Sequence, residues 1–170
     1  MTIRIDQLQK ASYRSTGQTS ISLNSAKSAG RRTAFLCHSH SDAALVKGLV
    51  QILKEQGWNI YVDWMDSTMP PKPNRTTANN IKNRIIQTEW FLFLATANSM
   101  SSRWCPWEIG YADGKKPIEK IVIIPTSSGQ TNHGNEYLDL YRRAIWADGG
   151  KLAVFDPGAT SGTYVSSLNN

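Results

Sequence analysis

The acid Glu108 lies in an unusual stretch, SSRWCPWEIGYADGKK, which also holds two tryptophans, a cysteine and a proline. Pro106 has no backbone N–H. This loss is harmless only in the first turn of a helix, so a helix is predicted to begin near Ser102 or Arg103. Trp104 and Glu108 are four residues apart and share one face of that helix. Glu108 would then lie near the positive end of the helix, where a carboxylate taken by itself is a partner of the helix dipole.

A second group of reactive side chains, CHSHSD, begins at Cys37. Cys37, His38 and His40 are potential zinc ligands, but no fourth ligand at a suitable spacing accompanies them, so no metal site is predicted. Cys37 and His38 are adjacent in an extended segment and point to opposite faces, which excludes a nucleophile and base pair. Cys105 is predicted to be a packing residue. The chain lacks a glycine-rich phosphate loop, so neither a dehydrogenase nor a kinase is supported.

Five short apolar runs predict buried strands. They are RTAFLCHS, WNIYVDW, WFLFLAT, KIVIIPT and KLAVF, at residues 32–39, 58–64, 90–96, 120–126 and 151–155. Asp42 is expected to cap the helix after the first run, whose inner face would carry Leu45, Val46, Leu49, Val50 and Leu53. A helix over residues 76–88 is expected to bury Ile81, Ile85 and Ile86.

This alternation of strand and helix predicts an α/β fold, an open parallel five-stranded sheet with helices on both faces. Residues 135–145 are expected to form a short helix or turn, and the tail from Asp156 to be loose. Sites in such folds form beyond the carboxyl ends of the strands. If the strands are neighbours, the polar loops CHSHSD, DWMD and TANSMSSRWCPWE meet in one cleft. The proline-rich segment MDSTMPPKPNR must be a long loop, and such loops are often functional.

The basic charge of the chain is concentrated at its N-terminus. Six of the 19 basic residues and one of the 13 acidic residues fall in residues 1–32, which leaves the rest nearly neutral. A nucleic acid groove is therefore not predicted. Residues 1–32 have little to bury and are expected to form a basic, Ser-rich arm, with residues 33–170 as the folded domain. Two alternatives are a short strand at TSISLNS, used in assembly, and an organelle transit peptide.

No apolar run of 18 residues and no signal pattern is present, so neither a membrane span nor secretion is expected. Two cysteines are too few for a disulfide framework. They indicate free thiols in a reducing compartment, and a cytoplasmic protein is predicted.

These motifs resemble the TIR (Toll/interleukin-1 receptor) domain family. AFLCHSHSD resembles the first box of the family, IYVDW its second strand, and SSRWCPWEIGYA the third box with its Trp-Cys-x-x-Glu pattern. The resemblance implies the flavodoxin-like TIR fold. The C-terminal stretch is more similar to the stand-alone TIR proteins of bacterial anti-phage systems such as Thoeris than to receptor TIR domains.

The resemblance implies cleavage of NAD⁺ at the nicotinamide–ribose bond, with Glu108 as the catalytic residue, NAD⁺ as substrate and no cofactor. A carboxylate beside the oxocarbenium-like ribose would stabilise the transition state. Substrate contacts are expected from His38, Ser39, Ser41, Asp63, Trp64, Arg103 and Trp104. Trp104 could orient Glu108 or wall the ribose pocket. Trp64 could stack on nicotinamide or only pack in its loop, and Asp63 could be structural.

The implied function is a bacterial immune enzyme that makes a cyclic or conjugated ADP-ribose signal for a separate effector. Self-assembly through TIR–TIR contacts is expected. The lack of a fused effector domain in 170 residues favours signal production over simple depletion of NAD⁺. Two alternatives remain open: a non-enzymatic TIR–TIR adaptor, and a bacterial effector that interferes with host TIR signalling.

Overall fold

A central parallel sheet organises the computed structural model, which describes residues 1–15, 21–64, 74–137 and 139–169. Its five parallel strands are β2 (Arg32–Cys37), β3 (Ile60–Asp63), β4 (Trp90–Ala95), β5 (Ile121–Ser128) and β7 (Arg142–Trp146). They lie in the spatial order β3-β2-β4-β5-β7. This is the doubly wound, flavodoxin-like order, in which the first strand lies inside the sheet. The predicted fold class is confirmed.

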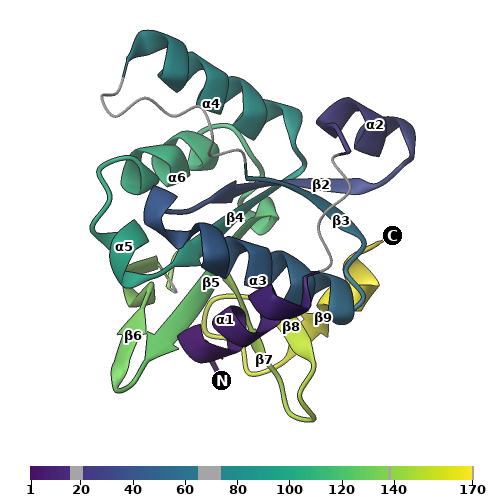
Figure 1. Cartoon of the computed structure of the whole chain (residues 1–170), viewed down its shortest axis with the longest axis vertical. Coiled ribbons are helices and arrows are strands. Elements are labelled where there is room, and N and C mark those ends of the chain that lie inside the picture. Colours follow the sequence, from purple (N-terminus) through teal and green to yellow (C-terminus); the bar gives the residue numbers. More distant parts are fainter. Residues whose placement is uncertain (16–20, 65–73, 138, 170) are drawn as a thin grey trace.

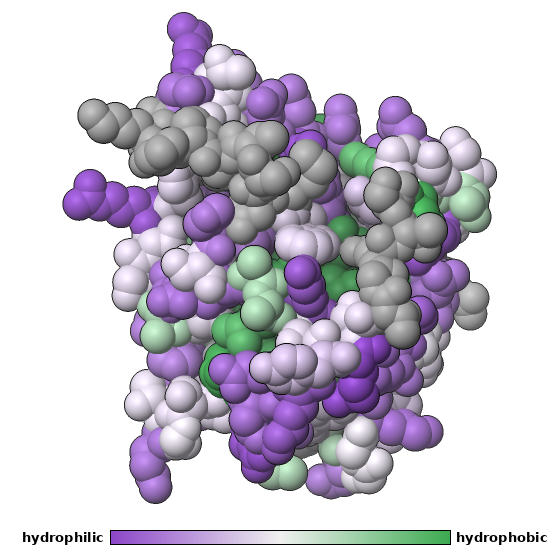
Figure 2. Space-filling view, in the orientation of Figure 1, coloured by the Kyte–Doolittle hydropathy of each residue, from purple (hydrophilic) through white to green (hydrophobic). Residues whose placement is uncertain are grey.

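Helices cover both faces of this sheet (Figure 1). One layer contains α1 (Ile5–Arg14) and α3 (Ala43–Glu55), and the other contains α4 (Arg75–Gln87) and α6 (Cys105–Asp113). Alternate residues of each strand enter the two cores, so Leu36 packs with the α3 layer and Phe35 and Cys37 with the α6 layer. On the face seen in Figure 2, hydrophobic residues are visible mainly at depth between hydrophilic ones.

The sheet has five parallel strands as predicted, but the fifth is not the predicted segment KLAVF. The segment 135–145 begins as a 3₁₀ turn, Asn135–Tyr137, and then forms the fifth parallel strand, β7. KLAVF forms β8 (Leu152–Phe155), which pairs antiparallel with β7. β7 was missed because it begins with two arginines. In the fold Arg142 pairs with Asp156 and Arg143 donates to two backbone carbonyls, so both charges are satisfied.

The C-terminal tail is ordered, contrary to the expectation of a loose segment. It forms β9 (Gly162–Tyr164), which extends the sheet from β8, and a 3₁₀ helix, Val165–Asn169. Val165 is fully buried in the α3-side core. The Asn169 amide donates to the carbonyl of Gly57 and its oxygen accepts from the backbone of Asn59. These bonds join the end of the chain to the turn between α3 and β3.

The expectation that residues 1–32 have little to bury is wrong. The short strand β1 (Ile3–Arg4) pairs in parallel with β5, and α1 packs directly on α3. Ile3, Leu8 and Ala11 are fully buried in the α3-side core. The close approach requires Gly48 on α3, because a Cβ there would lie 1.9 Å from the carbonyl oxygen of Leu8. The predicted domain boundary between residues 32 and 33 stays a prediction. Residues on both sides of it contribute to the α3-side core.

Several local details complete the fold. Within the described part of TSISLNS, Ser22 caps the short helix α2 (Leu23–Ser28), so residues 23–25 are helical and not extended. Ile86 is 55% exposed, because it lies one residue past Ile85 and therefore turns away from the core. The remaining elements are α5 (Ala97–Met100), β6 (Thr131–His133) and the 3₁₀ turns His40–Asp42 and Ile118–Lys120. No helix among the described residues has the length and hydropathy needed to cross a bilayer.

Candidate active site

The candidate site lies at the carboxyl ends of β2 and β4. The chain leaves β2 through α3 on one face, and it reaches β4 from α4 on the other face, so the topological switch point lies between these two neighbouring strands. Ligand sites of open α/β sheets form at such points. The loop after β2 and the loop after β4 therefore meet, as predicted for CHSHSD and TANSMSSRWCPWE.

Asp42 ties these two loops together. Its carboxylate accepts a hydrogen bond from Thr96 Oγ1 at 2.5 Å and another from Asn98 Nδ2 at 2.7 Å. Asp42 occupies the position before α3, but its side chain makes no capping bond. The predicted capping role is thus wrong. The carboxylate is buried and serves the neighbouring loop instead, a long-range partner that sequence spacing could not indicate.

Helix α6 begins at Cys105, later than predicted. The short helix α5 occupies residues 97–100, and Ser102 then provides the cap from outside α6. Its Oγ accepts the backbone N–H groups of Trp104 at 3.1 Å and Cys105 at 3.3 Å. Pro106 lies in the first turn, as its missing N–H requires. Trp104 occupies the position just before the helix and accepts the N–H of Glu108 at 2.9 Å.

Glu108 is the buried acid of this site. Only 5% of its surface is exposed, and its residue lies in the first turn of α6. Burial raises the pKa of Glu108 from 4.5 to about 7, and a hydrogen bond with the Cys37 side chain opposes this rise. A carboxyl group of this kind exchanges its proton near neutral pH. It can therefore act as an anion beside a cation and also accept a proton.

Cys37 lies beside Glu108 at the end of β2, and sequence reasoning did not include it in the site. Its Sγ lies 3.9 Å from the carbonyl oxygen of Cys105. Burial raises the pKa of the Cys37 thiol well above its usual value, with contributions from Cys105 and from the charge of Glu108. The thiol stays protonated, and its one hydrogen can be donated to the Cys105 carbonyl or to the Glu108 carboxylate. The alternation of β2 separates Cys37 from Leu36, but only the fold shows that Cys37 enters the core beneath α6.

The structure brings two of the predicted substrate residues, His38 and Trp64, together at the carboxyl ends of β2 and β3. The rings of His38 and Trp64 meet edge to face with centroids 6.5 Å apart. His38 Nδ1 lies 2.9 Å from the carbonyl oxygen of Leu36, which fixes the ring at the end of β2. Trp64 packs against the α3-side core. Ser39 is half-buried in the same loop, and Ser41 is exposed.

Asp63 is held by a different interaction. Its carboxylate is 3% exposed and forms a 2.7 Å ion pair with Nη1 of Arg84 on α4. This pair fastens the end of edge strand β3 to α4, which favours the structural role over a substrate contact. Most of the proline-rich loop, residues 65–73, lies outside the described residues.

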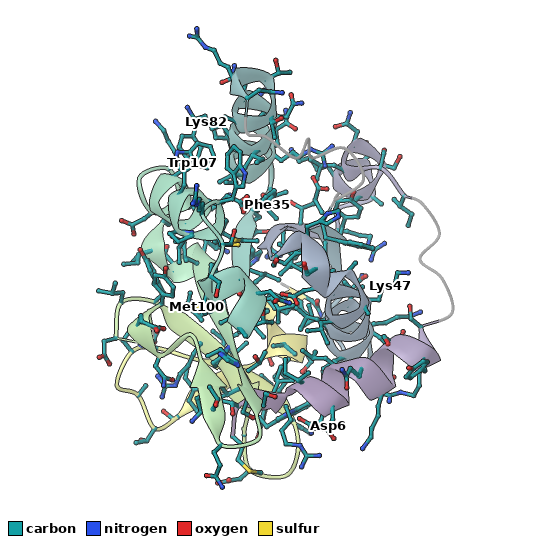
Figure 3. The ribbon with its side chains drawn as sticks, turned by 60° about the vertical axis from the view of Figure 1, so that its left-hand side comes forward. Asp6, Phe35, Lys47, Lys82, Met100 and Trp107 are labelled. Carbon is teal, nitrogen blue, oxygen red and sulfur yellow. The ribbon has the colours of Figure 1, made fainter. Side chains whose placement is uncertain are left out.

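Trp104 and Arg103 line a shallow groove of about 530 Å³ between α4 and α6. Trp104 meets Trp107 edge to face at 5.2 Å, and Trp107 stacks on Tyr111. Lys82 of α4 lies over Trp107, with Nζ 5.7 Å from the ring centroid (Figure 3). Arg103 therefore lies with this aromatic surface and not with His38. Among the hydrogen bonds of the described residues, none joins the side chains of Trp104 and Glu108, so the orienting role of the tryptophan stays a prediction.

The sequence of this chain matches a family model over residues 34–152, and that model describes the TIR domain. The chain belongs to the TIR domain family. This confirms the predicted resemblance, and the match includes Glu108 together with the loops that follow β2 and β4. Within the described residues, no group of three or more His, Cys, Asp or Glu side chains is arranged to hold a metal ion.

Two curated relatives add the names of similar proteins. A protein of Bacillus cereus (strain MSX-D12), named probable 3' cyclic ADP-D-ribose synthase ThsB', is 36% identical over 112 residues, which are 63% of this chain and 57% of the relative. The putative cyclic ADP-D-ribose synthase TIR2 of Cytobacillus dafuensis is 28% identical over 102 residues, 58% of this chain and 27% of the relative. The aligned part thus spans about half or less of each relative.

Proposed function

We propose that this TIR domain cleaves NAD⁺ at the nicotinamide–ribose bond and closes the ADP-ribose part into a cyclic product. The observation that carries the proposal is the buried carboxyl of Glu108 at the switch point of the sheet. Its pKa of about 7 leaves a large fraction ionised at neutral pH. The names of the two relatives support the cyclic product over open ADP-ribose.

The reaction needs one carboxylate. When the bond breaks, its electron pair goes to the pyridinium nitrogen, so nicotinamide leaves as a neutral molecule without a proton. Positive charge develops on the ribose carbon in the transition state. Ionised Glu108 therefore stabilises the transition state more strongly than it stabilises the bound substrate. A hydroxyl group of the same ADP-ribose then bonds to that carbon and releases its proton to Glu108. The balance is NAD⁺ to cyclic product, nicotinamide and one proton.

The finer parts of this proposal concern the cell. We expect the enzyme to act in the cytoplasm in anti-phage immunity of the Thoeris kind. We also expect it to assemble through TIR–TIR contacts and to pass its product to a separate effector.

His38 and Trp64 would bind the substrate beside Glu108, because they lie together at the same end of β2 and β3. Ser39 and Ser41 share that loop, whereas Arg103 and Trp104 would contact substrate from the groove between α4 and α6.

The test is to incubate the purified full chain with NAD⁺ at high protein concentration and separate the products by chromatography with mass detection. Glu108→Gln is run alongside, and Glu136→Gln, an exposed acid, serves as the matched control. Nicotinamide release that Glu108→Gln abolishes and Glu136→Gln retains would support the proposal. A product one water lighter than ADP-ribose would establish cyclisation, and open ADP-ribose would limit the activity to hydrolysis. No release, also in lysate from phage-infected cells, would favour the adaptor reading.

A further inference from the structure

A second hollow lies beside edge strand β3, on the α3 side of the sheet. It has a volume of about 690 Å³, and its described lining comes from the N-terminal segment, the outer side of α3 and β3. Glu108 is not part of this lining and packs on the α6 side. The hollow is therefore separate from the candidate catalytic carboxyl. Its size suits a small-molecule ligand.

The described lining of this hollow is basic. It contains Arg31, Lys47 and Lys54 and no acidic residue. Among the described residues, none of these three cations has an ion-pair partner. Figure 3 shows Lys47 on α3, and its side chain is part of the lining of the hollow. Cations gathered around one concave surface raise its potential and attract anions.

The one acid beside Lys54 in the sequence is already occupied. Glu55 forms a 2.8 Å ion pair with Arg14 and accepts a hydrogen bond from Gln51 at 2.9 Å. Arg14 thus holds a partner that Lys54 lacks. The charge of the hollow is left unbalanced by the part of the chain that the structure describes.

Two buried donors of the lining also lack an acceptor. Arg31 Nε and Trp58 Nε1 are buried and make no hydrogen bond. Trp58 is only 2% exposed, and buried donors in folded proteins are nearly always bonded. Both unsatisfied groups are donors, as are the three cationic heads. The charged side chains of the described lining are all cationic, and this charge favours an anionic ligand.

We propose that this hollow is a binding site for a phosphate-bearing anion of the polyphosphate or nucleotide class. Arg31, Lys47 and Lys54 bind the phosphate oxygens by charge-assisted hydrogen bonds. Trp64 also lines the hollow and contacts His38, so a bound anion lies one side chain from the candidate active site. The proposal does not depend on the proposed NAD⁺ cleavage.

The test is isothermal titration calorimetry of the full chain with inorganic tripolyphosphate and, separately, with ATP. Binding of one tripolyphosphate per chain is expected. We expect binding to weaken roughly tenfold in each of Arg31→Gln, Lys47→Gln and Lys54→Gln, because each substitution removes one charge-assisted hydrogen bond to the anion. Lys115→Gln, which removes an exposed lysine after α6, and Glu108→Gln should leave it unchanged. Lys47 and Lys54 are exposed, so their variants should fold normally.

The second titrant identifies the ligand source. Tighter binding of ATP than of tripolyphosphate would assign the site to a nucleotide, and equal affinity would assign it to phosphate groups alone. The proposal would be overturned if neither tripolyphosphate nor ATP bound at millimolar concentration. It would also be overturned if Lys115→Gln weakened binding as much as Lys54→Gln, since the effect would then be general surface charge. Binding that Glu108→Gln strengthened and that the Arg31, Lys47 and Lys54 variants left unchanged would place the anion beside Glu108 instead, because the substitution removes a repelling charge.

Discussion

At the scale of single residues, the cost of keeping Glu108 buried should be visible in the stability of the protein. The pKa of Glu108 is raised from 4.5 to about 7, so the folded state binds a proton between these pH values that the unfolded state has lost. Stability therefore falls as pH rises through this window. Glu108→Gln, which keeps the shape and removes the charge, should be more stable than the wild type at pH 8 by up to about 3 kcal/mol.

Urea denaturation at pH 5 and pH 8 measures this effect. The two proteins should differ little at pH 5, where Glu108 is protonated in the folded state. Glu136→Gln, at an exposed position, is the matched control and should follow the wild type. An equal difference between Glu108→Gln and wild type at both pH values would show that the carboxyl does not titrate as described.

The thiol of Cys37 should tune the acid beside it. Its hydrogen bond lowers the pKa of Glu108, so Cys37→Ala should move the pKa upward and Cys37→Ser, which keeps a donor, should move it less. If NAD⁺ cleavage needs ionised Glu108, kcat/KM should rise through pH 7 in the wild type and at higher pH in Cys37→Ala. The pH dependence of stability should shift the same way, a readout that does not require activity. Unchanged profiles in Cys37→Ala would remove Cys37 from this role.

At the scale of elements, the contact between α1 and α3 depends on one glycine. A Cβ at Gly48 would lie 1.9 Å from the carbonyl oxygen of Leu8, and backbone cannot move aside as a flexible side chain can. Gly48→Ala should therefore destabilise the protein by roughly 1–3 kcal/mol, although alanine favours a helix over glycine. Guanidinium denaturation measures the loss, and amide exchange should show reduced protection of α1.

Gly110 on α6 provides the matched control for this prediction. A Cβ there meets nothing within 4 Å, so Gly110→Ala should stabilise the protein by up to about 1 kcal/mol through helix propensity. If Gly48→Ala were as stable as Gly110→Ala, α1 would not be seated on α3 as the structure shows.

At the scale of the whole molecule, the N-terminal helix and the central sheet should unfold together. Leu8 is fully buried, so Leu8→Ala should lower the free energy of unfolding by about 2–5 kcal/mol. Tyr13, on the same helix, is 90% exposed, and Tyr13→Ala should change it by no more than about 0.5 kcal/mol. Tryptophan fluorescence reports this well, because all six tryptophans lie outside residues 1–32. A loose arm would instead make both substitutions neutral.

The sequence by itself determined the strand and helix alternation, the parallel sheet and the place of Glu108 near a helix start. These features depend on local signals: continuous apolar runs such as WFLFLAT, the proline in the first turn of α6 and the four-residue spacing of Trp104 and Glu108. The family boxes follow the same segments, which is why the family could be predicted before the fold.

Only the tertiary structure decided which partners these residues have. β7 contains two arginines whose acceptors are Asp156 and Ala159 of the tail and the carbonyl of Glu119, and α1 packs on α3 at Gly48, 40 residues after Leu8. Asp42 serves Thr96 instead of its own helix, and Cys37 meets Glu108 across the two halves of the sheet. Burial, and with it the pKa of Glu108, arises from segments distant in the chain. Local periodicity carries no information on such contacts.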